Sequence, residues 1–250
     1  MRNKSKKLKI IVVLPAYNAQ ETLKKTVAEI PKNFIDEIIL VDDYSSDKTF
    51  LLAKKLGLVV YRHKKNQGYG ANQKTCYQIA LKKKADIIIM LHPDYQYDPK
   101  LISFFVPLIK MGYFDLILGT RIRSREEALK SGMPLYKYLS NRFLSFFQNI
   151  LTGQNLSEWH TGFRVYHRKV LQAIDFTKFR NDFLFDTQML LAAVEKKFKI
   201  GEISIPARYH PQASSIGFWP GLKYGLGTLF LTIIFFIRKM FYDKNKLNNN

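Results

Sequence analysis

The sequence predicts an α/β fold in which a mostly parallel central sheet is flanked by helices and is followed by an apolar C-terminal helix. Two observations predict the sheet and its core. Up to about Leu118, short β-branched runs alternate with helical patterns, which is typical of parallel strands joined by crossover helices. The composition is 47% hydrophobic and 14% aromatic, which supplies one large core and excludes disorder over most of the chain.

We expect the strands of this first part at Lys9–Leu14, Glu37–Val41, Leu58–Tyr61, Asp86–Leu91 and Asp115–Leu118. The helices between them carry signals at their ends. Asn18 with Glu21 resembles an N-cap and its capping-box partner. Gly57 is typical of the residue that follows a helix, and Asp98-Pro99 is typical of a helix start. The first apolar run ends at Pro15 and is too short for a secretory signal, so it predicts a buried strand.

From Gly119 to about Arg208 the alternation lapses. The patterns there predict a basic loop, a helix over Pro134–Leu151, a strand over Phe163–Tyr166, a helix over Leu184–Lys197 and a strand over Gly201–Pro206. We therefore expect one domain over residues 1–215, and a membrane-associating apolar helix with a polar tail over residues 216–250.

The charge balance points to an anionic partner. The chain has 40 Lys and Arg residues against 20 Asp and Glu residues, a formal net charge of +20. Such an excess favours nucleic acid, an anionic membrane or phosphorylated ligands. The basic residues form separate clusters, and no recognition helix or stacking motif accompanies them, so we do not expect nucleic-acid binding.

The loops that follow the first two strands indicate a nucleotide site. In parallel sheets, ligands bind at the carboxyl ends of the strands. These two loops read Pro15-Ala16-Tyr17-Asn18 and Asp42-Asp43-Tyr44-Ser45-Ser46-Asp47. Two adjacent carboxylates repel each other unless they bind something, so Asp42 and Asp43 are expected to accept hydrogen bonds from a nucleobase or ribose. The alternative is a turn in which Ser46 or Asp47 caps the next helix.

The next two loops favour diphosphate and metal binding. The loop Asn66–Asn72 contains two glycines, which would bring backbone N–H groups close to an anion at a helix N-terminus, although a plain tight turn explains them equally well. In the following loop, His92, Asp94 and Gln96 alternate along the chain and would point the same way if the loop is extended. An imidazole, a carboxylate and an amide oxygen are able to hold a divalent cation, with ligand phosphates filling the other positions.

In combination, these loops resemble the inverting nucleotide-sugar glycosyltransferases of family 2, in the branch of the dolichyl-phosphate mannose and glucose synthases. The resemblance covers about Lys9 to about Ser215 and includes three further motifs: Gly119-Thr120-Arg121, Thr161-Gly162-Phe163-Arg164 and Phe185-Asp186. It implies a GT-A fold, which is Rossmann-like, a donor diphosphate held by Mg²⁺ or Mn²⁺, and inversion at the sugar carbon.

The resemblance also implies roles for individual residues. Contacts with the nucleotide-sugar are expected from Pro15, Tyr17, Asn18, Asp42, Asp43, Gly68 and Asp94. Metal ligands are expected at His92, Asp94 and Gln96, and the transfer itself is expected to involve Asp94, Arg121, Arg164 and Asp186. The chain departs from the family pattern at three positions, with His92 where an aspartate is usual, Glu158 where aspartate is frequent and Gln188 where glutamate is common.

The acceptor decides whether a general base is needed. A polyprenyl phosphate is already an anion, so its transfer needs cations, for which the candidates are Arg121, Arg123, Lys137, Arg142, Arg164 and Arg208. A hydroxyl acceptor needs a carboxylate base, for which Glu158 and Asp186 are the candidates. Three simpler interpretations stay open. Many of the arginines belong to a solvated face, or Asp186 caps a helix or pairs with a lysine. The third is that the whole protein binds a nucleotide-sugar with weak catalytic activity. His160 and His210 are assigned no role.

The apolar stretch Gly217–Ile237 predicts a membrane surface as partner. Its uncharged part, Tyr224–Ile237, is 14 residues long, which favours an interfacial helix over a spanning one, with a buried core helix as the alternative. The aromatic residues Phe218, Trp219 and Tyr224 suit an interface. A single cysteine, Cys76, excludes an intramolecular disulfide. We therefore expect a protein on the cytoplasmic face of a membrane that accepts a lipid phosphate, binds anionic liposomes and becomes soluble when cut after about Ser215. The oligomeric state stays open.

Overall fold

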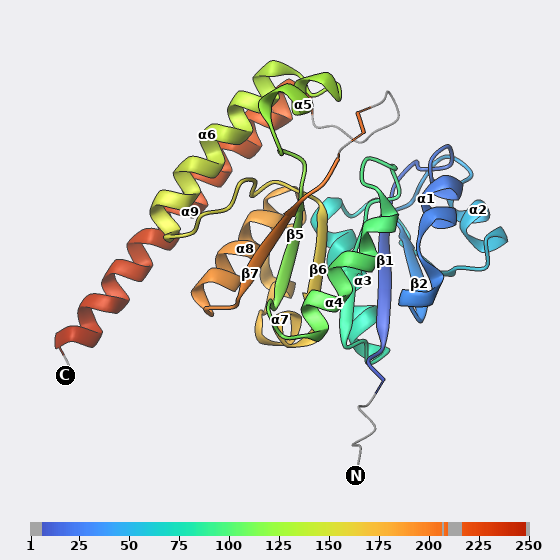
Figure 1. Cartoon of the computed structure of the whole chain (residues 1–250), viewed down its shortest axis with the longest axis horizontal. Helices are drawn as coiled ribbons and strands as arrows, with labels where there is room; N and C mark the ends of the chain where they lie inside the picture. Colours follow the sequence, from blue (N-terminus) through green and yellow to red (C-terminus); the bar gives the residue numbers. More distant parts are fainter. Residues whose placement is uncertain (1–6, 207, 210–216, 249–250) are drawn as a thin grey trace, which may run out of the picture.

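A computed structural model describes residues 7–206, 208–209 and 217–248 of the chain. Seven strands form one mixed sheet in the order β3-β2-β1-β4-β6-β5-β7 (Figure 1). The strands are β1 (Ile10–Ala16), β2 (Glu37–Asp42), β3 (Val59–Arg62), β4 (Ile87–Met90), β5 (Leu116–Thr120), β6 (Phe163–His167) and β7 (Ile200–Ser204). β6 runs antiparallel to β4 and β5, and the other neighbouring strands are parallel.

Helices cover both faces of the sheet because the central strands are apolar on both sides. The helices are α1 (Leu23–Glu29), α2 (Thr49–Lys55), α3 (Tyr69–Lys82), α4 (Ile102–Lys110), α5 (Arg125–Lys130), α6 (Leu135–Thr152), α7 (Arg168–Ala173), α8 (Leu184–Glu195) and α9 (Phe218–Asn248). Short 3₁₀ turns lie at Lys32–Phe34, Pro99–Leu101 and Phe176–Lys178. Along β1, Ile11 and Val13 pack in the core with α3 and α8, whereas Val12 and Leu14 pack in the core with α1 and α4.

The predicted fold class is confirmed, and each predicted strand overlaps an observed one. Gly57 has φ +73° after α2, and the Asp98 side chain accepts a hydrogen bond from Lys100 N at 3.0 Å, so both of these helix-end predictions are confirmed. The capping box at Asn18 is wrong. α1 begins at Leu23, and the Asn18 side chain instead accepts a hydrogen bond from Ser46 N at 2.9 Å in the neighbouring loop.

Two helices were not expected. α5 lies inside the predicted basic loop, and α7 follows β6 directly. The start of α5 has a recognisable signal, because the Ser124 side chain accepts a hydrogen bond from Glu127 N at 3.1 Å. That is half of the capping box that a serine followed three residues later by glutamate predicts.

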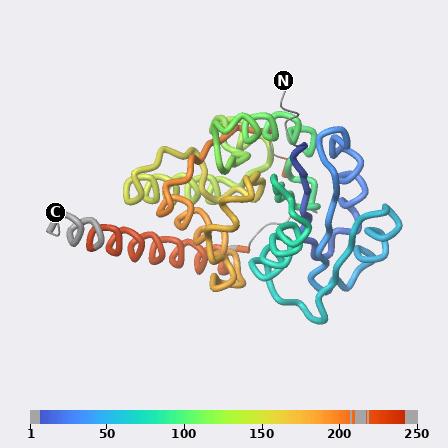
Figure 2. Tube along the Cα trace, turned by 90° about the horizontal axis from the view of Figure 1, so that it is seen from below, coloured from blue at the N-terminus to red at the C-terminus, as the bar shows by residue number. Residues whose placement is uncertain are grey.

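The C-terminal helix α9 lies beside α6 and also packs against α8 (Figures 1 and 2). Its inward face carries buried Thr228, Thr232 and Phe235, and Gly227 fits closely against Leu184. The first half of α9 is therefore built onto the domain, and its last turns extend away from the body (Figure 2). Among the described residues, one segment, Trp219–Phe241, is long and apolar enough to cross a membrane by length and composition.

Candidate active site

A large cavity of about 1390 Å³ opens at the carboxyl ends of the central strands. Loops after β1, β2 and β4 form one side of this cavity, and residues from α6 and α9 form the other. Nine of the predicted site residues line it, namely Pro15, Tyr17, Asp43, Gly68, His92, Asp94, Gln96, Arg121 and Asp186. The other three, Asn18, Asp42 and Arg164, are not among its lining residues. The strand-end position predicted for the site thus agrees with the cavity.

The two aspartates after β2 have different surroundings. Asp43 accepts hydrogen bonds from Gln67 N and Gly68 N, both at 2.9 Å, and from the His63 ring at 2.6 Å. Asp42 is completely buried, pairs with Arg62 Nε at 3.0 Å and accepts a hydrogen bond from Ser45 N at 3.2 Å. Asp43 therefore reaches the cavity, whereas Asp42 shapes the loop beneath it and is not positioned to touch a nucleotide. Asn18 likewise joins two loops through Ser46 and does not line the cavity.

The glycine loop before α3 is explained by close packing. A Cβ atom at Gly68 would lie 2.7 Å from the carbonyl oxygen of Asn181, and one at Gly70 would lie 2.6 Å from that of Arg180. The backbone N–H of Gly70 donates to the Asn181 carbonyl at 2.7 Å. This end of α3 is thus held by the 180–183 segment, so the plain structural interpretation of Gly70 is the better one.

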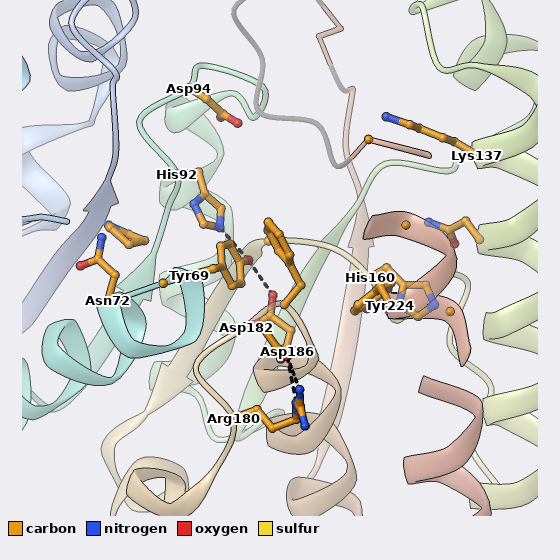
Figure 3. A pocket seen from close by; sticks show the side chains of 18 of the residues that line it. Tyr69, Asn72, His92, Asp94, Lys137, His160, Arg180, Asp182, Asp186 and Tyr224 are labelled. Carbon is orange, nitrogen blue, oxygen red and sulfur yellow. Dashed lines mark hydrogen bonds and ion pairs between the residues drawn. The ribbon is translucent and has the colours of Figure 1, made fainter. Parts of the chain in front are cut away.

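Of the three expected metal ligands, Asp94 has the most suitable position. Its carboxylate points into the cavity (Figure 3), and its Oδ1 accepts a hydrogen bond from Gln96 N at 3.1 Å. His92 lies against Tyr69, with Nε2 at 3.0 Å from the Tyr69 hydroxyl, and the Gln96 side chain accepts a hydrogen bond from Arg121 at 3.3 Å. His92 and Gln96 are thus committed to protein contacts, and the expectation that they ligate a metal is not supported by these contacts.

The residues present fit a divalent cation that is shared with a substrate. In the described part of the chain, no three His, Cys, Asp or Glu side chains gather as a metal cage. One carboxylate oxygen donor at a cavity suits Mg²⁺ or Mn²⁺ when diphosphate oxygens complete the coordination. Asp94 is the residue that would hold such an ion.

Asp186 lies at the centre of a buried polar chain. Its Oδ2 accepts a hydrogen bond from the Tyr69 hydroxyl at 2.7 Å, and its Oδ1 accepts one from Gln73 at 3.2 Å. Because Tyr69 gives its only hydroxyl proton to Asp186, the imidazole of His92 donates to Tyr69 through Nε2. The Arg164 guanidinium lies 3.5 Å from Asp186. Asp186 therefore pairs with a buried arginine, and the alternative of a lysine pair is wrong.

Arg164 is a structural cation beneath the site. It is completely buried and donates hydrogen bonds to the carbonyl oxygens of Thr161 and Asp186 at 3.0 Å and of Trp159 at 3.4 Å. Burial by itself would lower the pKa of Arg164, but the charge of Asp186 raises it above its usual range. The expectation that Arg164 contacts the sugar or the acceptor is therefore not met, because the side chain supports Asp186 from behind.

The Arg121 guanidinium binds a carboxylate of the protein. It donates through Nε and Nη2 to Glu158, and its Nη2 also donates to the His160 carbonyl at 3.0 Å. Glu158 is completely buried and also accepts a hydrogen bond from Asn141 at 2.9 Å. Burial would raise the pKa of Glu158, but Arg121 and its hydrogen bonds lower it below the usual value. Two of the guanidinium nitrogens of Arg121 are thus held by Glu158, and a contact between Arg121 and a phosphate stays a prediction. Glu158 is not accessible as a general base.

We expect Arg121→Ala to lower the free energy of unfolding by about 3 kcal/mol or more, because it leaves the buried Glu158 carboxylate without its cation. The matched control is Arg123→Ala, which breaks an exposed pair with Glu127 and should cost far less, because water screens an exposed ion pair. Urea denaturation of both variants measures the difference. Equal losses in the two variants would contradict the structural role of Arg121.

Sequence reasoning missed two residues of the cavity, Tyr69 and His160. Tyr69 links His92 to Asp186, and His160 lies within hydrogen-bond distance of the Tyr224 hydroxyl, with Nδ1 at 2.6 Å. Tyr224 thus points into the protein, contrary to the interfacial position expected for it. Tyr69 and His160 are close in sequence to the Gly68 and Gly162 motifs, and this proximity was the available signal for both residues. His210 and the Phe218 side chain lie outside the described residues.

Comparison with known proteins gives a family match. The sequence model described as Glycosyl transferase family 2 matches residues 11–175. An uncharacterized protein of Methanocaldococcus jannaschii is 30% identical over 215 residues, which cover 86% of this chain and 88% of that protein. The UDP-N-acetylglucosamine–dolichyl-phosphate N-acetylglucosaminyltransferase of Methanococcus voltae is 26% identical over 217 residues, which cover 80% of this chain and 86% of that protein.

A solved structure supports the fold. Glucosyl-3-phosphoglycerate synthase from Mycobacterium tuberculosis, in complex with Mn²⁺, uridine-diphosphate-glucose and phosphoglyceric acid, has a TM-score of 0.69 to this chain. The sequences are 18% identical, and the match covers 90% of this chain and 79% of the synthase chain. At this identity the likeness shows the fold alone, and it confirms the predicted GT-A-like arrangement.

Proposed function

The chain belongs to glycosyl transferase family 2, and we propose that it transfers a sugar from a nucleoside-diphosphate sugar to the phosphate of a polyprenyl lipid, with inversion at the sugar carbon. The observation that carries the proposal is the composition of the cavity. Its strand-end side holds Asp43 and Asp94, and its other side combines apolar residues of α6 and α9 with Lys137. A polar donor and an amphipathic acceptor fit these two sides respectively.

The strand-end side suits the donor. Pro15, Tyr17 and Asp43 border the space beside Asp94, and aromatic and carboxylate groups contact nucleobases and ribose by stacking and hydrogen bonding. The Methanococcus voltae relative is named for a UDP-sugar donor, and the tuberculosis synthase was solved with UDP-glucose and Mn²⁺. A divalent cation at Asp94 would supply charge stabilisation of the leaving diphosphate.

The opposite side suits a lipid phosphate. Phe143 of α6 and Leu222, Leu226 and Leu229 of α9 line it, and Lys137 extends its ammonium group into the same space (Figure 3). Burial and the positive charge of Arg121 lower the pKa of Lys137, so an entering anion would gain from pairing with it. A phosphate oxygen is already anionic and needs no proton acceptor, which agrees with a site where Glu158 is buried under Arg121.

A hydroxyl acceptor is the second candidate, and the position of Asp186 on the cavity wall favours it. A carboxylate there would have to take the hydroxyl proton. Asp186 already accepts hydrogen bonds from Tyr69 and Gln73 and lies beside Arg164. These contacts occupy both carboxylate oxygens of Asp186, so the lipid phosphate is the better proposal.

Transfer to a polyprenyl phosphate in detergent tests the proposal. Purified protein is incubated with Mn²⁺ and a panel of labelled UDP- and GDP-sugars, and the label is then extracted into organic solvent. We expect extractable product with the lipid phosphate and none with the matched polyprenol, which lacks the phosphate. Product formed with a glycan or sugar hydroxyl but not with the lipid phosphate would contradict the proposal and favour the second candidate.

A further inference from the structure

Helices α6 and α9 turn polar side chains toward the domain and large apolar side chains outward, which is the opposite of most surface helices. On α6, the inward face carries buried Asn141, Ser145, Gln148 and Thr152. The outward face carries a stripe that repeats at helical spacing, formed by Leu135, Leu139, Phe143, Phe146 and Ile150. Each of these five side chains is between 56% and 64% exposed. A soluble surface helix shows the opposite pattern, so this face is suited to an apolar partner.

α9 carries a second outward stripe. It consists of Trp219, Leu222, Leu226, Phe230, Ile233, Ile237 and Met240, whose exposed fractions lie between 42% and 70%. Its inward face packs on the domain through Thr228, Thr232 and Phe235. The side of α9 that packs on the domain is not available to lipid, so α9 would cross a bilayer only if it separated from the domain.

The two stripes meet at the mouth of the active-site cavity. Phe143 of the α6 stripe and Leu222 and Leu226 of the α9 stripe all line that cavity, and the two helices lie side by side (Figure 1). The stripes are thus two parts of one apolar surface, which we call the α6–α9 face. Lys137 of α6 lines the same cavity.

The charges around the α6–α9 face identify its partner. Among the residues whose side chains the structure describes, α6 and α9 carry the basic residues Lys137, Arg142, Lys223, Arg238 and Lys239. The same described part of the two helices carries no acidic residue. Helices that combine an exposed apolar stripe with an excess of basic residues match the interface of an anionic bilayer, in which acyl chains lie beneath phosphate headgroups.

We propose that the α6–α9 face lies flat in the headgroup region of an anionic membrane, with α9 parallel to the bilayer and not across it, and that the acceptor lipid enters the cavity between the two helices. The inference deepens the proposed function, because it states how a lipid phosphate reaches the site. The α6 stripe contributes to membrane binding as much as α9 does, so the membrane contact includes the catalytic domain itself.

Flotation of the full-length protein with vesicles of phosphatidylcholine and phosphatidylglycerol tests the inference. We expect Phe146→Ser with Ile150→Ser, both on α6, to weaken binding at least about tenfold, because two large apolar side chains no longer enter the lipid. The matched control is Phe104→Ser with Met111→Ser, at two equally exposed positions in and just after α4, which should bind as the wild type does. Thermal melts verify that each variant is folded, and Phe230→Ser on α9 is a second variant.

The orientation of α9 is tested by a protease-cleavable tag at the C-terminus. On sealed vesicles, the inference requires the tag to stay accessible to external protease. A protected tag, or unchanged binding of the α6 variant, would overturn it. Lipid-free dimers that do not float would show instead that a second copy covers the face. The vesicles contain no donor or acceptor, so a protein that floats but glycosylates only a soluble acceptor would refute the proposed function and leave this inference standing.

Discussion

Asp94→Asn is expected to lower the rate of sugar transfer at least about 100-fold while the protein stays folded. Metal charge stabilisation at a leaving diphosphate is worth several kcal/mol, and each 1.4 kcal/mol corresponds to about tenfold in rate. The side chain lies at the cavity, and asparagine has nearly the same size and shape as aspartate. Asparagine keeps the Oδ1 atom that accepts the hydrogen bond from Gln96 N, so the loop should retain its conformation.

The control for this variant is Asp98→Asn in the same loop. Asp98 caps the turn before α4, and asparagine is an equally good cap, so transfer should change little. Titration with Mn²⁺ in the presence of UDP supplies a readout besides activity, since the ternary complex should form with the wild type and Asp98→Asn but not with Asp94→Asn. Full activity of the wild type in excess EDTA would contradict the role given to Asp94.

The fold was predictable because its signals are local. Strands such as β1 and β4 are apolar runs that are too short to form helices of ordinary length. The helical patterns between these runs predict that the strands pair in parallel. The antiparallel direction of β6 is different. It depends on how the chain returns after α6, and no short pattern encodes that return.

The site was predictable in outline and not in its ion pairs. Arg121 and Arg164 look alike in the sequence, since each stands at the end of a family motif and each is a candidate cation for an acceptor phosphate. Their partners are remote: Glu158 lies 37 residues after Arg121, and Asp186 lies 22 residues after Arg164. Whether a guanidinium faces a ligand or a buried carboxylate is decided by tertiary packing, which a single sequence does not report.

Tertiary packing also decides which side of α9 faces the domain. Its apolar residues were visible in the sequence, but the inward direction of Tyr224 depends on His160, which lies 64 residues earlier in the chain. The threonines at 228 and 232 interrupt the apolar run at the positions that face α8. The helix therefore has one face for the domain and another that is turned outward. Cutting the chain after Ser215 would remove part of the active-site wall together with the α9 half of the α6–α9 face, and would leave the α6 stripe in place.

His160 should make the folded protein lose stability as the pH falls from about 6.5 to about 4. Burial lowers the pKa of His160 to about 4, whereas an unfolded chain binds the proton near pH 6.5. Between these values the unfolded state holds more protons than the folded state does, so acid favours unfolding. A difference of this size corresponds to roughly 3 kcal/mol when fully developed. Above about pH 6.5 both states are neutral at this residue, and its contribution is constant.

The difference between the wild type and His160→Gln isolates this contribution, because the other histidines titrate equally in both proteins. Glutamine keeps an amide near the Tyr224 hydroxyl but takes up no proton in this range. Urea denaturation at pH 7.5, 5.5 and 4.5 measures the free energy of unfolding of both. We expect the free energy of unfolding of His160→Gln to rise relative to that of the wild type as the pH falls. Parallel curves would mean that His160 is protonated as readily in the folded protein as in the unfolded chain, and that its contact with Tyr224 opens to water and does not join α9 to the floor of the active site.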